Sequence, residues 1–313
     1  MSKLILHSHA KLNLYLKVIN KRQDNYHNIE TIFERISLAD TIILKERRDN
    51  LIRVICSSRS VPSGNSNLAY QSAKLLQDGL GLDKGVDIKI AKRIPVGSGM
   101  GGGSSDAASV LLGLNIIWKL KLNRRQLLKY AKRLGSDVPF FLYDSSFALG
   151  TGRGDLIRPL TALNGTKIWH VLVVPRGKVS TPFIYEQWDR ENCQKSQLAP
   201  PVPVQGVTLK GEKAGLTRGR FNVKLLPLAL IAKDFFSVKK LLFNSLQETT
   251  SRFYPKLRRI ATELNNLGAE SSLMSGSGPA VFAIVSSRKE AVVLGRQVKK
   301  SNKAWQVFVV RTQ

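Results

Sequence analysis

The stretch "PVGSGMGGGSSDAAS", residues 95–109, concentrates glycine at one point of the chain. Glycine occupies five of the seven positions from Gly97 to Gly103. Because glycine loses more conformational freedom on folding than any other residue, such a cluster indicates a tight turn or a close approach of the backbone to another group. Alternating apolar residues predict a strand over 86–94, and an amphipathic pattern predicts a helix over 104–120. A strand, a glycine loop and a helix form the context of an anion site at a helix N-terminus.

Three kinds of nucleotide-binding loop can be compared with this stretch. A P-loop requires a lysine after the glycines, and none is present. Gly97, Gly99 and Gly102 satisfy GxGxxG, but no acid lies between Asp106 and Asp137, so the dinucleotide-binding fold is excluded. A phosphate loop followed by serines remains, with hydroxyls for phosphate oxygens or a magnesium ion. The alternative that the glycines only allow close packing of helix on strand stays open.

Hydrophobic periodicity predicts further elements on both sides of the loop. Strands are expected near 12–18, 41–46, 51–56, 170–175, 279–285 and 305–311, and helices near 67–81, with Asn67 as N-cap, and near 123–135, 235–249, 253–268 and 288–300. Residues 190–224 lack periodicity and are expected to form a loop or a mobile insertion. The pattern predicts an α+β protein of two domains, with a boundary near 160–170.

The charge is strongly basic, with 49 Lys+Arg against 22 Asp+Glu and a net charge of +27. The basic residues are spread along the whole chain, and the densest patch, 119–133, also carries a leucine stripe that predicts a helix packed on a core. We therefore favour a general lysine bias over a nucleic-acid surface, although the charge also suits anionic substrates. No nucleic-acid partner is expected.

Cysteine content and hydropathy predict a cytoplasmic protein. Cys56 and Cys193 are far apart in the sequence, which argues against a disulfide framework and a structural zinc site. No apolar run approaches the ~20 residues of a membrane helix, and no secretory signal is readable at the N-terminus. Neither a membrane nor a resident metal is expected, and a homodimer remains an option.

Four motifs in order carry a resemblance to a known family. The stretch 95–108 resembles the phosphate loop of the GHMP kinases. "HAKLNLYLKVINKRQDNYHNIETIFERISLAD" (9–40), "LGSDVPFFL" (134–142) and "SGSGPAVFAI" (275–284) are similar to motifs of the GHMP branch that acts on 4-diphosphocytidyl-2-C-methyl-D-erythritol. The resemblance covers roughly 1–185 and 236–285. It implies a GHMP kinase fold, with a ribosomal-S5-like N-terminal domain (1–165) and a ferredoxin-like C-terminal domain (166–313).

The resemblance implies a catalytic pair, Lys11 and Asp137, with Asp137 taking the proton of the 2-hydroxyl of the erythritol during phosphoryl transfer from ATP. Alternation along the first strand places Lys11, Asn13 and Tyr15 on one face. Without the resemblance, Asp137 is a turn residue that caps the next element, and Lys11 is a solvated strand lysine.

The resemblance also implies the binding residues. ATP, with Mg²⁺ as its cofactor ion, is expected to contact Asn67, Pro95, Val96, Gly97, Ser98, Gly99, Met100, Gly101, Gly102, Gly103, Ser104 and Ser105, although a plain N-cap is the alternative for either serine. The cytidine-linked substrate is expected to contact Asn13, Tyr26, His27, Phe33, Thr181 and Tyr185. Tyr26 and His27 favour this substrate over homoserine or mevalonate, the substrates of the nearest alternative GHMP kinases. A basic nucleic-acid-binding protein on the same scaffold is the alternative from another class.

Overall fold

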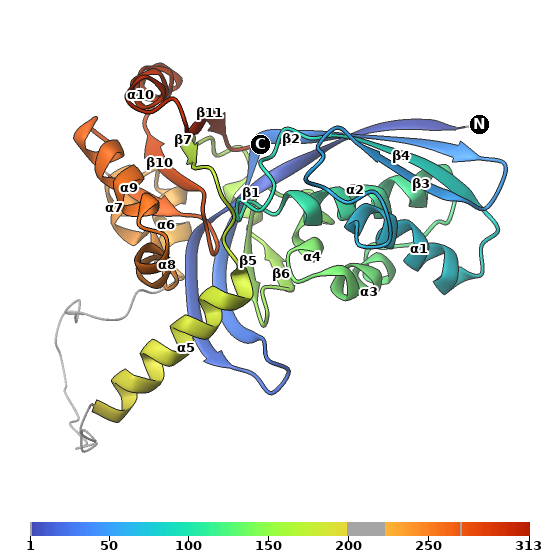
Figure 1. Cartoon of the computed structure of the whole chain (residues 1–313), viewed down its shortest axis with the longest axis horizontal. Helices are drawn as coiled ribbons and strands as arrows, with labels where there is room; N and C mark the ends of the chain where they lie inside the picture. Colours follow the sequence, from blue (N-terminus) through green and yellow to red (C-terminus); the bar gives the residue numbers. More distant parts are fainter. Residues whose placement is uncertain (1, 199–222, 270) are drawn as a thin grey trace.

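A computed structural model describes residues 2–198, 223–269 and 271–313, which form two sheets with helices packed against them (Figure 1). The larger sheet has the order β3-β4-β2-β1-β8, with β5 paired to β2 and β6 paired to β5. Its strands are β1 (Lys3–Lys21), β2 (His27–Arg47), β3 (Ile52–Cys56), β4 (Gly85–Ala91), β5 (Phe147–Thr151), β6 (Leu156–Pro159) and β8 (Phe243–Asn244).

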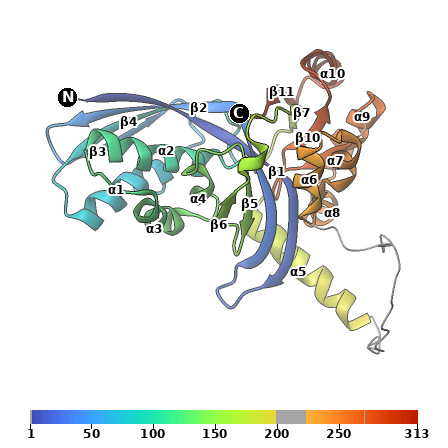
Figure 2. The same cartoon turned by 180° about the vertical axis from the view of Figure 1, so that it is seen from behind.

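The long hairpin of β1 and β2 reaches beyond the rest of the larger sheet and lies beside helix α5 (Thr181–Leu198) (Figures 1 and 2). Its strands pair antiparallel, and Lys21 lies opposite His27 at the closed end. The sequence predicted only 12–18 and 41–46 of this hairpin. The prediction was too short because most of β2 is buried on both faces, which removes the alternation that marks a half-exposed strand.

A β-bulge in β1 redirects the side chains around Asn13. The pairing register with β2 shifts between Asn13 and Tyr15. The Tyr15 ring lies 5.6 Å from that of Phe243 in the apolar core, whereas Leu16 lines a cavity together with Asn13. The predicted shared face of Lys11, Asn13 and Tyr15 was therefore wrong for Tyr15, because a bulge inserts a residue that simple alternation does not count.

Four helices pack on the larger sheet: α1 (Leu68–Leu80), α2 (Gly102–Ile117), α3 (Arg124–Leu134) and α4 (Val138–Phe141) (Figure 1). Their shared core includes Leu44 and Ile88 from strands and Leu111 and Leu114 from α2, all fully buried. Each such side chain contributes ~1.5–3 kcal/mol on burial. The helix expected over 104–120 is shifted at both ends, because α2 begins at Gly102 and ends at Ile117.

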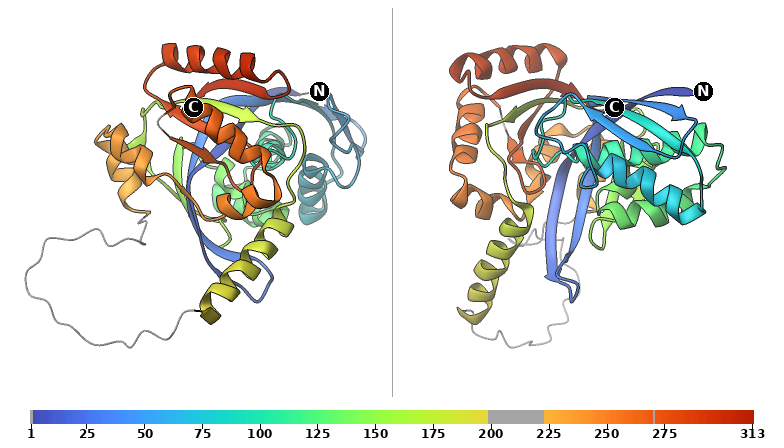
Figure 3. Two further views of the ribbon diagram at one scale, coloured as in Figure 1. Left: turned by 60° about the vertical axis from the view of Figure 1, so that its left-hand side comes forward. Right: turned by 45° about the vertical axis from the view of Figure 1, so that its right-hand side comes forward.

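The smaller sheet is antiparallel in the order β11-β7-β10-β9, as the ferredoxin-like expectation requires. Its strands are β7 (Trp169–Val174), β9 (Ser272–Met274), β10 (Val281–Val285) and β11 (Gln306–Arg311). The helices of this half, besides α5, are α6 (Leu225–Ile231), α7 (Phe235–Leu241), α8 (Gln247–Phe253), α9 (Lys256–Asn266) and α10 (Arg288–Ser301), as Figure 3 shows from two sides. The short 3₁₀ turn η1 (Thr161–Leu163) precedes β7.

Two predictions for the C-terminal half were wrong. The helix expected over 235–249 is interrupted by β8, because the buried Asn244 amide donates to the carbonyl oxygens of Met274 (2.7 Å) and Gly276 (2.8 Å). The loop expected from residue 190 is helical as far as Leu198, and 199–222 lie outside the described residues. Tertiary contacts overrode local propensity at both places.

A buried polar cluster joins the two sheets. Glu34 on β2 lies 2.9 Å from His170 Nε2 on β7, and the hydroxyl of Thr312 donates to the same carboxylate oxygen at 2.6 Å. The three residues are fully buried. Because buried polar groups need partners, this cluster fixes how β2, β7 and the chain after β11 pack together.

Along the described ranges, no helix has the length and apolar character to cross a membrane.

Candidate active site

Lys11 on β1 and Asp137 before α4 meet in space. The Lys11 Nζ lies 3.4 Å from Oδ2 of Asp137, with exposed fractions of 5% and 31% for the two side chains. Lys11 is therefore not a solvated strand lysine. Asp137 stands at the N-cap position of α4 but makes no capping hydrogen bond, so the capping alternative does not account for it either. The carboxylate of Asp137 therefore lies beside the ammonium of Lys11, at the cavity that both residues line.

A chain of hydrogen bonds fixes the ammonium of Lys11. Its Nζ donates to Oδ1 of Asn13 at 2.7 Å, and the Asn13 amide donates to the hydroxyl of Thr31 at 2.8 Å. That hydroxyl donates in turn to the Tyr15 carbonyl at 2.7 Å. The backbone amide of Lys11 also donates to the Met100 carbonyl at 3.0 Å, which ties β1 to the glycine loop. The charge is thus held in place before any ligand arrives.

The glycine loop touches two other motifs of the chain. Gly99 has φ +80°, and a Cβ there would lie 2.6 Å from the Ser275 carbonyl oxygen. Gly101 has φ +69°, and a Cβ there would lie 3.2 Å from Cε of Lys11. Close packing therefore requires glycine at these two positions. Because the loop also lines cavities, the packing and ligand interpretations hold together.

Two cavities meet at this loop. The first, of about 430 Å³, is lined by Lys11, Asp137 and the residues of the hairpin and of α5. The second, of about 340 Å³, lies over the loop and the start of α2. Gly99 and Gly101 line both. A phosphate held on the loop can therefore face the catalytic pair.

The second cavity gathers the predicted ATP residues with one exception. Its lining includes Asn67, Pro95, Val96, Gly97, Ser98, Gly99, Met100, Gly101, Gly102, Gly103 and Ser104. Ser105 is buried and does not line it. The N-cap of α2 is Gly101 without a side-chain hydrogen bond, so neither serine is the N-cap. The first amides of this 16-residue helix are thus available to an anion.

A buried charge network lies at the back of the second cavity. Lys92 Nζ lies 2.8 Å from Oδ2 of Asp106 and also contacts the carboxylate of Asp40. Burial, reinforced by Asp40, raises the pKa of Asp106 to about 7, although Lys92 acts in the opposite direction. Lys92 and Asp106 both line the cavity. No pattern in the sequence predicted Lys92 at this cavity, and Asp106 was expected to have no catalytic role.

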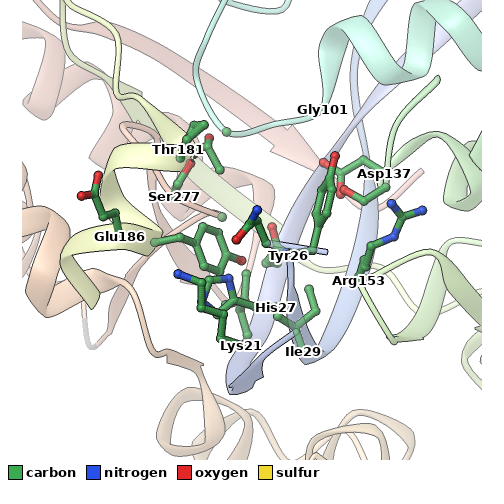
Figure 4. Close-up of a pocket in the computed structure, with 18 of the residues that line it drawn as sticks. Lys21, Tyr26, His27, Ile29, Gly101, Asp137, Arg153, Thr181, Glu186 and Ser277 are labelled. Atoms are coloured by element: carbon green, nitrogen blue, oxygen red, sulfur yellow. Dashed lines mark hydrogen bonds between the residues drawn. The ribbon is translucent and has the colours of Figure 1, made fainter. Parts of the chain in front are cut away.

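The first cavity ends in an aromatic group, shown in Figure 4. Tyr26 is half-exposed under the guanidinium of Arg153, whose Cζ lies 4.7 Å from the ring centroid. The buried ring of His27 lies 4.7 Å from that of Tyr185, and burial raises the Tyr185 pKa above its usual range. Thr181 shares a 2.7 Å hydrogen bond with Ser277 at the other side of the cavity.

Phe33, expected to touch substrate, is nearly fully buried and only borders the cavity. Its ring stacks on that of Phe140 at 4.9 Å and lies under the Lys11 ammonium at 5.3 Å. Phe33 therefore supports Lys11 from below.

Sequence reasoning missed several residues of the first cavity, among them Lys21, Arg153, Asp189 and Ser277. Asp189 follows Tyr185 by four positions, so both lie on one side of α5. Recognising the helix in "TPFIYEQWDREN" would have revealed this pair, but its hydrophobic pattern is weak. Lys21 and Ser277 lie within the motifs at 9–40 and 275–284 but were not assigned a role, and Arg153 lies outside the quoted motifs.

The chain is similar to known proteins over nearly its whole length. Residues 67–145 match the GHMP kinases N terminal domain, and residues 228–304 match the GHMP kinases C terminal domain. A 4-diphosphocytidyl-2-C-methyl-D-erythritol kinase from Bacillus velezensis is 41% identical over 276 residues, which covers 88% of this chain and 86% of the relative. A relative of the same name from Acetivibrio thermocellus is 34% identical over 312 residues and covers 100% of both chains. The chain belongs to the 4-diphosphocytidyl-2-C-methyl-D-erythritol kinase family of the GHMP kinases.

Solved structures agree with membership of this kinase family. A crystal structure of 4-(cytidine 5'-diphospho)-2C-methyl-D-erythritol kinase has a TM-score of 0.74 at 29% identity and covers 99% of this chain and 100% of its own. A homoserine kinase from Cytophaga hutchinsonii has a TM-score of 0.72 at 17% identity, covering 100% of this chain and 95% of its own, which shows a shared fold alone. The predicted GHMP kinase fold and the prediction of an ATP-dependent small-molecule kinase are confirmed.

Proposed function

We propose that this kinase transfers the γ-phosphate of ATP to the 2-hydroxyl of 4-diphosphocytidyl-2-C-methyl-D-erythritol, in the non-mevalonate isoprenoid pathway. The observation that carries the proposal is the place of Lys11 and Asp137, where a cavity over the phosphate loop meets a cavity that ends at Tyr26 and His27. Relatives over the full chain carry the name of this kinase.

In this proposal, each group of the site has a chemical task. Asp137 takes the proton of the 2-hydroxyl, a bond forms from that oxygen to the γ-phosphorus, and the bond from this phosphorus to the bridging oxygen of ADP breaks. Lys11 stabilises the charge that develops on the oxygens during transfer. A positioned base contributes roughly 10²–10⁴-fold, and fixed charges near the phosphoryl group supply much of the rest.

The loop residues suit ATP with Mg²⁺. Among the described residues, no cluster of three or more His, Cys, Asp or Glu could hold a metal ion. Mg²⁺ usually binds through one or two carboxylates together with substrate phosphates, so Asp106 and the hydroxyl of Ser104 at the second cavity would hold the ion together with the phosphates of ATP. Oδ1 of Asp106 is buried without a hydrogen-bond partner in the described structure, which fits this role. Bound with the nucleotide, the ion would neutralise charge on the phosphates.

Homoserine and mevalonate are poorer candidates as substrates. The first cavity is about 430 Å³ and continues from Asp137 to Tyr26 and His27. A small alcohol would fill only the end near Lys11 and leave the aromatic end empty, whereas a cytosine ring has a flat face to stack there.

The deciding experiment measures ADP release from ATP and magnesium with three alcohols offered in parallel: the cytidyl-erythritol substrate, homoserine and mevalonate. We expect turnover with the first alone. Turnover only with homoserine or mevalonate would keep the kinase and overturn the substrate. Folded protein that binds ATP but phosphorylates none of the three would overturn the proposal.

Three further expectations stay predictions: a cytoplasmic location, a homodimer and the absence of a nucleic-acid partner. The +27 charge is the observation that favours the nucleic-acid alternative. Binding to DNA that weakens steeply with salt, without ADP release, would support that alternative. Light scattering after size exclusion measures the oligomeric state.

A further inference from the structure

We propose that Asp189 is a positioning residue that sets the tautomer of His27 and so makes the site select cytosine over uracil. The inference rests on the proposed function, because it concerns the base end of the same substrate. It adds a residue of α5 to the recognition of the base.

The first support is a short contact on the cavity wall. Oδ1 of Asp189 lies 2.7 Å from Nε2 of His27, and Oδ2 lies 2.9 Å from Nζ of Lys21. Burial alone would raise the pKa of Asp189, but hydrogen bonds from His27 and Lys21 outweigh it and hold the pKa below its ordinary value. All three residues line the first cavity, and Figure 4 shows Lys21 and His27 together at its aromatic end.

The protonation pattern of the ring follows from this contact. An ionised carboxylate only accepts hydrogen bonds, so Nε2 of His27 must carry a hydrogen. A neutral imidazole has one such hydrogen, which leaves Nδ1 as an acceptor. No hydrogen bond to Nδ1 is recorded from the part of the chain that the structure describes. Nδ1 is thus left for a ligand.

The ring cannot turn to exchange its two nitrogens freely. Its face lies against Tyr185, with centroids 4.7 Å apart, and it meets Trp188 at an interplanar angle of 90° with centroids 6.1 Å apart. Trp188 and Asp189 follow Tyr185 by three and four residues, so all three lie on one side of α5 and hold the ring of His27 there. The same helix therefore positions His27 and fixes its tautomer.

An acceptor at Nδ1 distinguishes the two pyrimidines. At position 4, cytosine carries an amino group, a donor, whereas uracil carries a carbonyl oxygen, an acceptor. With the base held in one orientation, Nδ1 accepts from the cytosine amine but faces a second acceptor in uracil. A site built around one hydrogen bond rejects the analogue that cannot make it.

The test compares Asp189→Asn with the wild type on the cytidyl substrate and on its uridyl analogue. An asparagine amide can donate to Nε2, which moves the ring hydrogen to Nδ1 and turns it into a donor. We expect the ratio of kcat/KM between the cytidyl and uridyl substrates to fall by roughly tenfold or more, mainly through KM. Glu191→Gln is the matched control, because it removes the same charge from α5 where Glu191 binds Thr249 and Arg252 instead of His27. Its substrate ratio should equal that of the wild type.

A second measurement reads the tautomer directly. The chain has four histidines, so ¹⁵N-histidine labelling gives few ring signals to assign. At pH 8, His27 should show a protonated Nε2 in the wild type and a protonated Nδ1 in Asp189→Asn. A wild-type His27 protonated at Nδ1, or an unchanged substrate ratio in a folded Asp189→Asn, would overturn the inference. Failure of the wild type to phosphorylate the cytidyl substrate would overturn the proposed function instead and leave the ring measurement readable.

Discussion

Gly99→Ala should damage both the fold and the reaction, for reasons that can be separated. The residue has φ +80°, which costs an alanine ~1–2 kcal/mol. The new Cβ would lie 2.6 Å from the Ser275 carbonyl oxygen and 2.8 Å from that of Gly278. Carbon–oxygen contacts are ordinarily ~3.3 Å or longer, so the loop must move by roughly 0.7 Å. Overpacking of this kind adds ~1–3 kcal/mol.

The kinetic effect follows from the same displacement. A misplacement near 1 Å costs roughly 100-fold in rate, so we expect kcat/KM for ATP to fall by about 10–100-fold. Urea unfolding measures the loss of stability, and coupled ADP release measures the kinetics.

The matched control is Gly81→Ala at the C-cap of α1. Gly81 has φ +59°, but a Cβ there would meet nothing within 4 Å. It therefore pays the left-handed penalty of ~1–2 kcal/mol alone, far from the phosphate loop. Equal losses of stability in the two variants, with normal kinetics for Gly99→Ala, would refute the argument that the loop needs glycine for close approach.

Three other outcomes are expected. Asp137→Asn should lower kcat at least ~100-fold with unchanged ATP affinity by calorimetry, and near-normal turnover would exclude Asp137 as the base. Because burial raises the pKa of Asp106 from 3.8 to about 7, this group makes the free energy of unfolding fall as pH rises between these values, and Asp106→Asn should flatten that slope in urea titrations. Thr312→Val removes hydrogen bonds to Glu34 (2.6 Å) and from the Ile168 amide (2.8 Å), so unfolding should be easier by ~1–3 kcal/mol with unchanged kinetics.

Much of the fold around the phosphate loop could be predicted from the sequence, because local signals suffice there. The cap of α1 is an example: Asn67 accepts from the Ala69 amide as expected for an N-cap. Elements that depend on distant partners were missed. β8 exists only because it pairs with Tyr15 and Leu16 of β1.

The candidate site divides in the same way. The motifs predicted that Lys11, Asp137 and the phosphate loop belong to one site, because each lies in a stretch with a recognisable family pattern. Asp189 and Arg153 reach the cavity from segments without such a pattern. A sequence does not reveal which of many charged side chains will lie beside a distant ring, since the contact is made only after β1, β2 and α5 have packed.

The hairpin of β1 and β2 carries both ends of the proposed substrate site. The Lys11 ammonium lies at one end, and Lys21 lies opposite His27 at the closed end of the hairpin. A single hairpin therefore carries the residues proposed to meet the reacting hydroxyl and the residues proposed to meet the base. An alcohol without the nucleotide would contact only the end of the site at Lys11. The affinity of the distant base would then be missing from the transition state, so a truncated substrate should react slowly even at saturation.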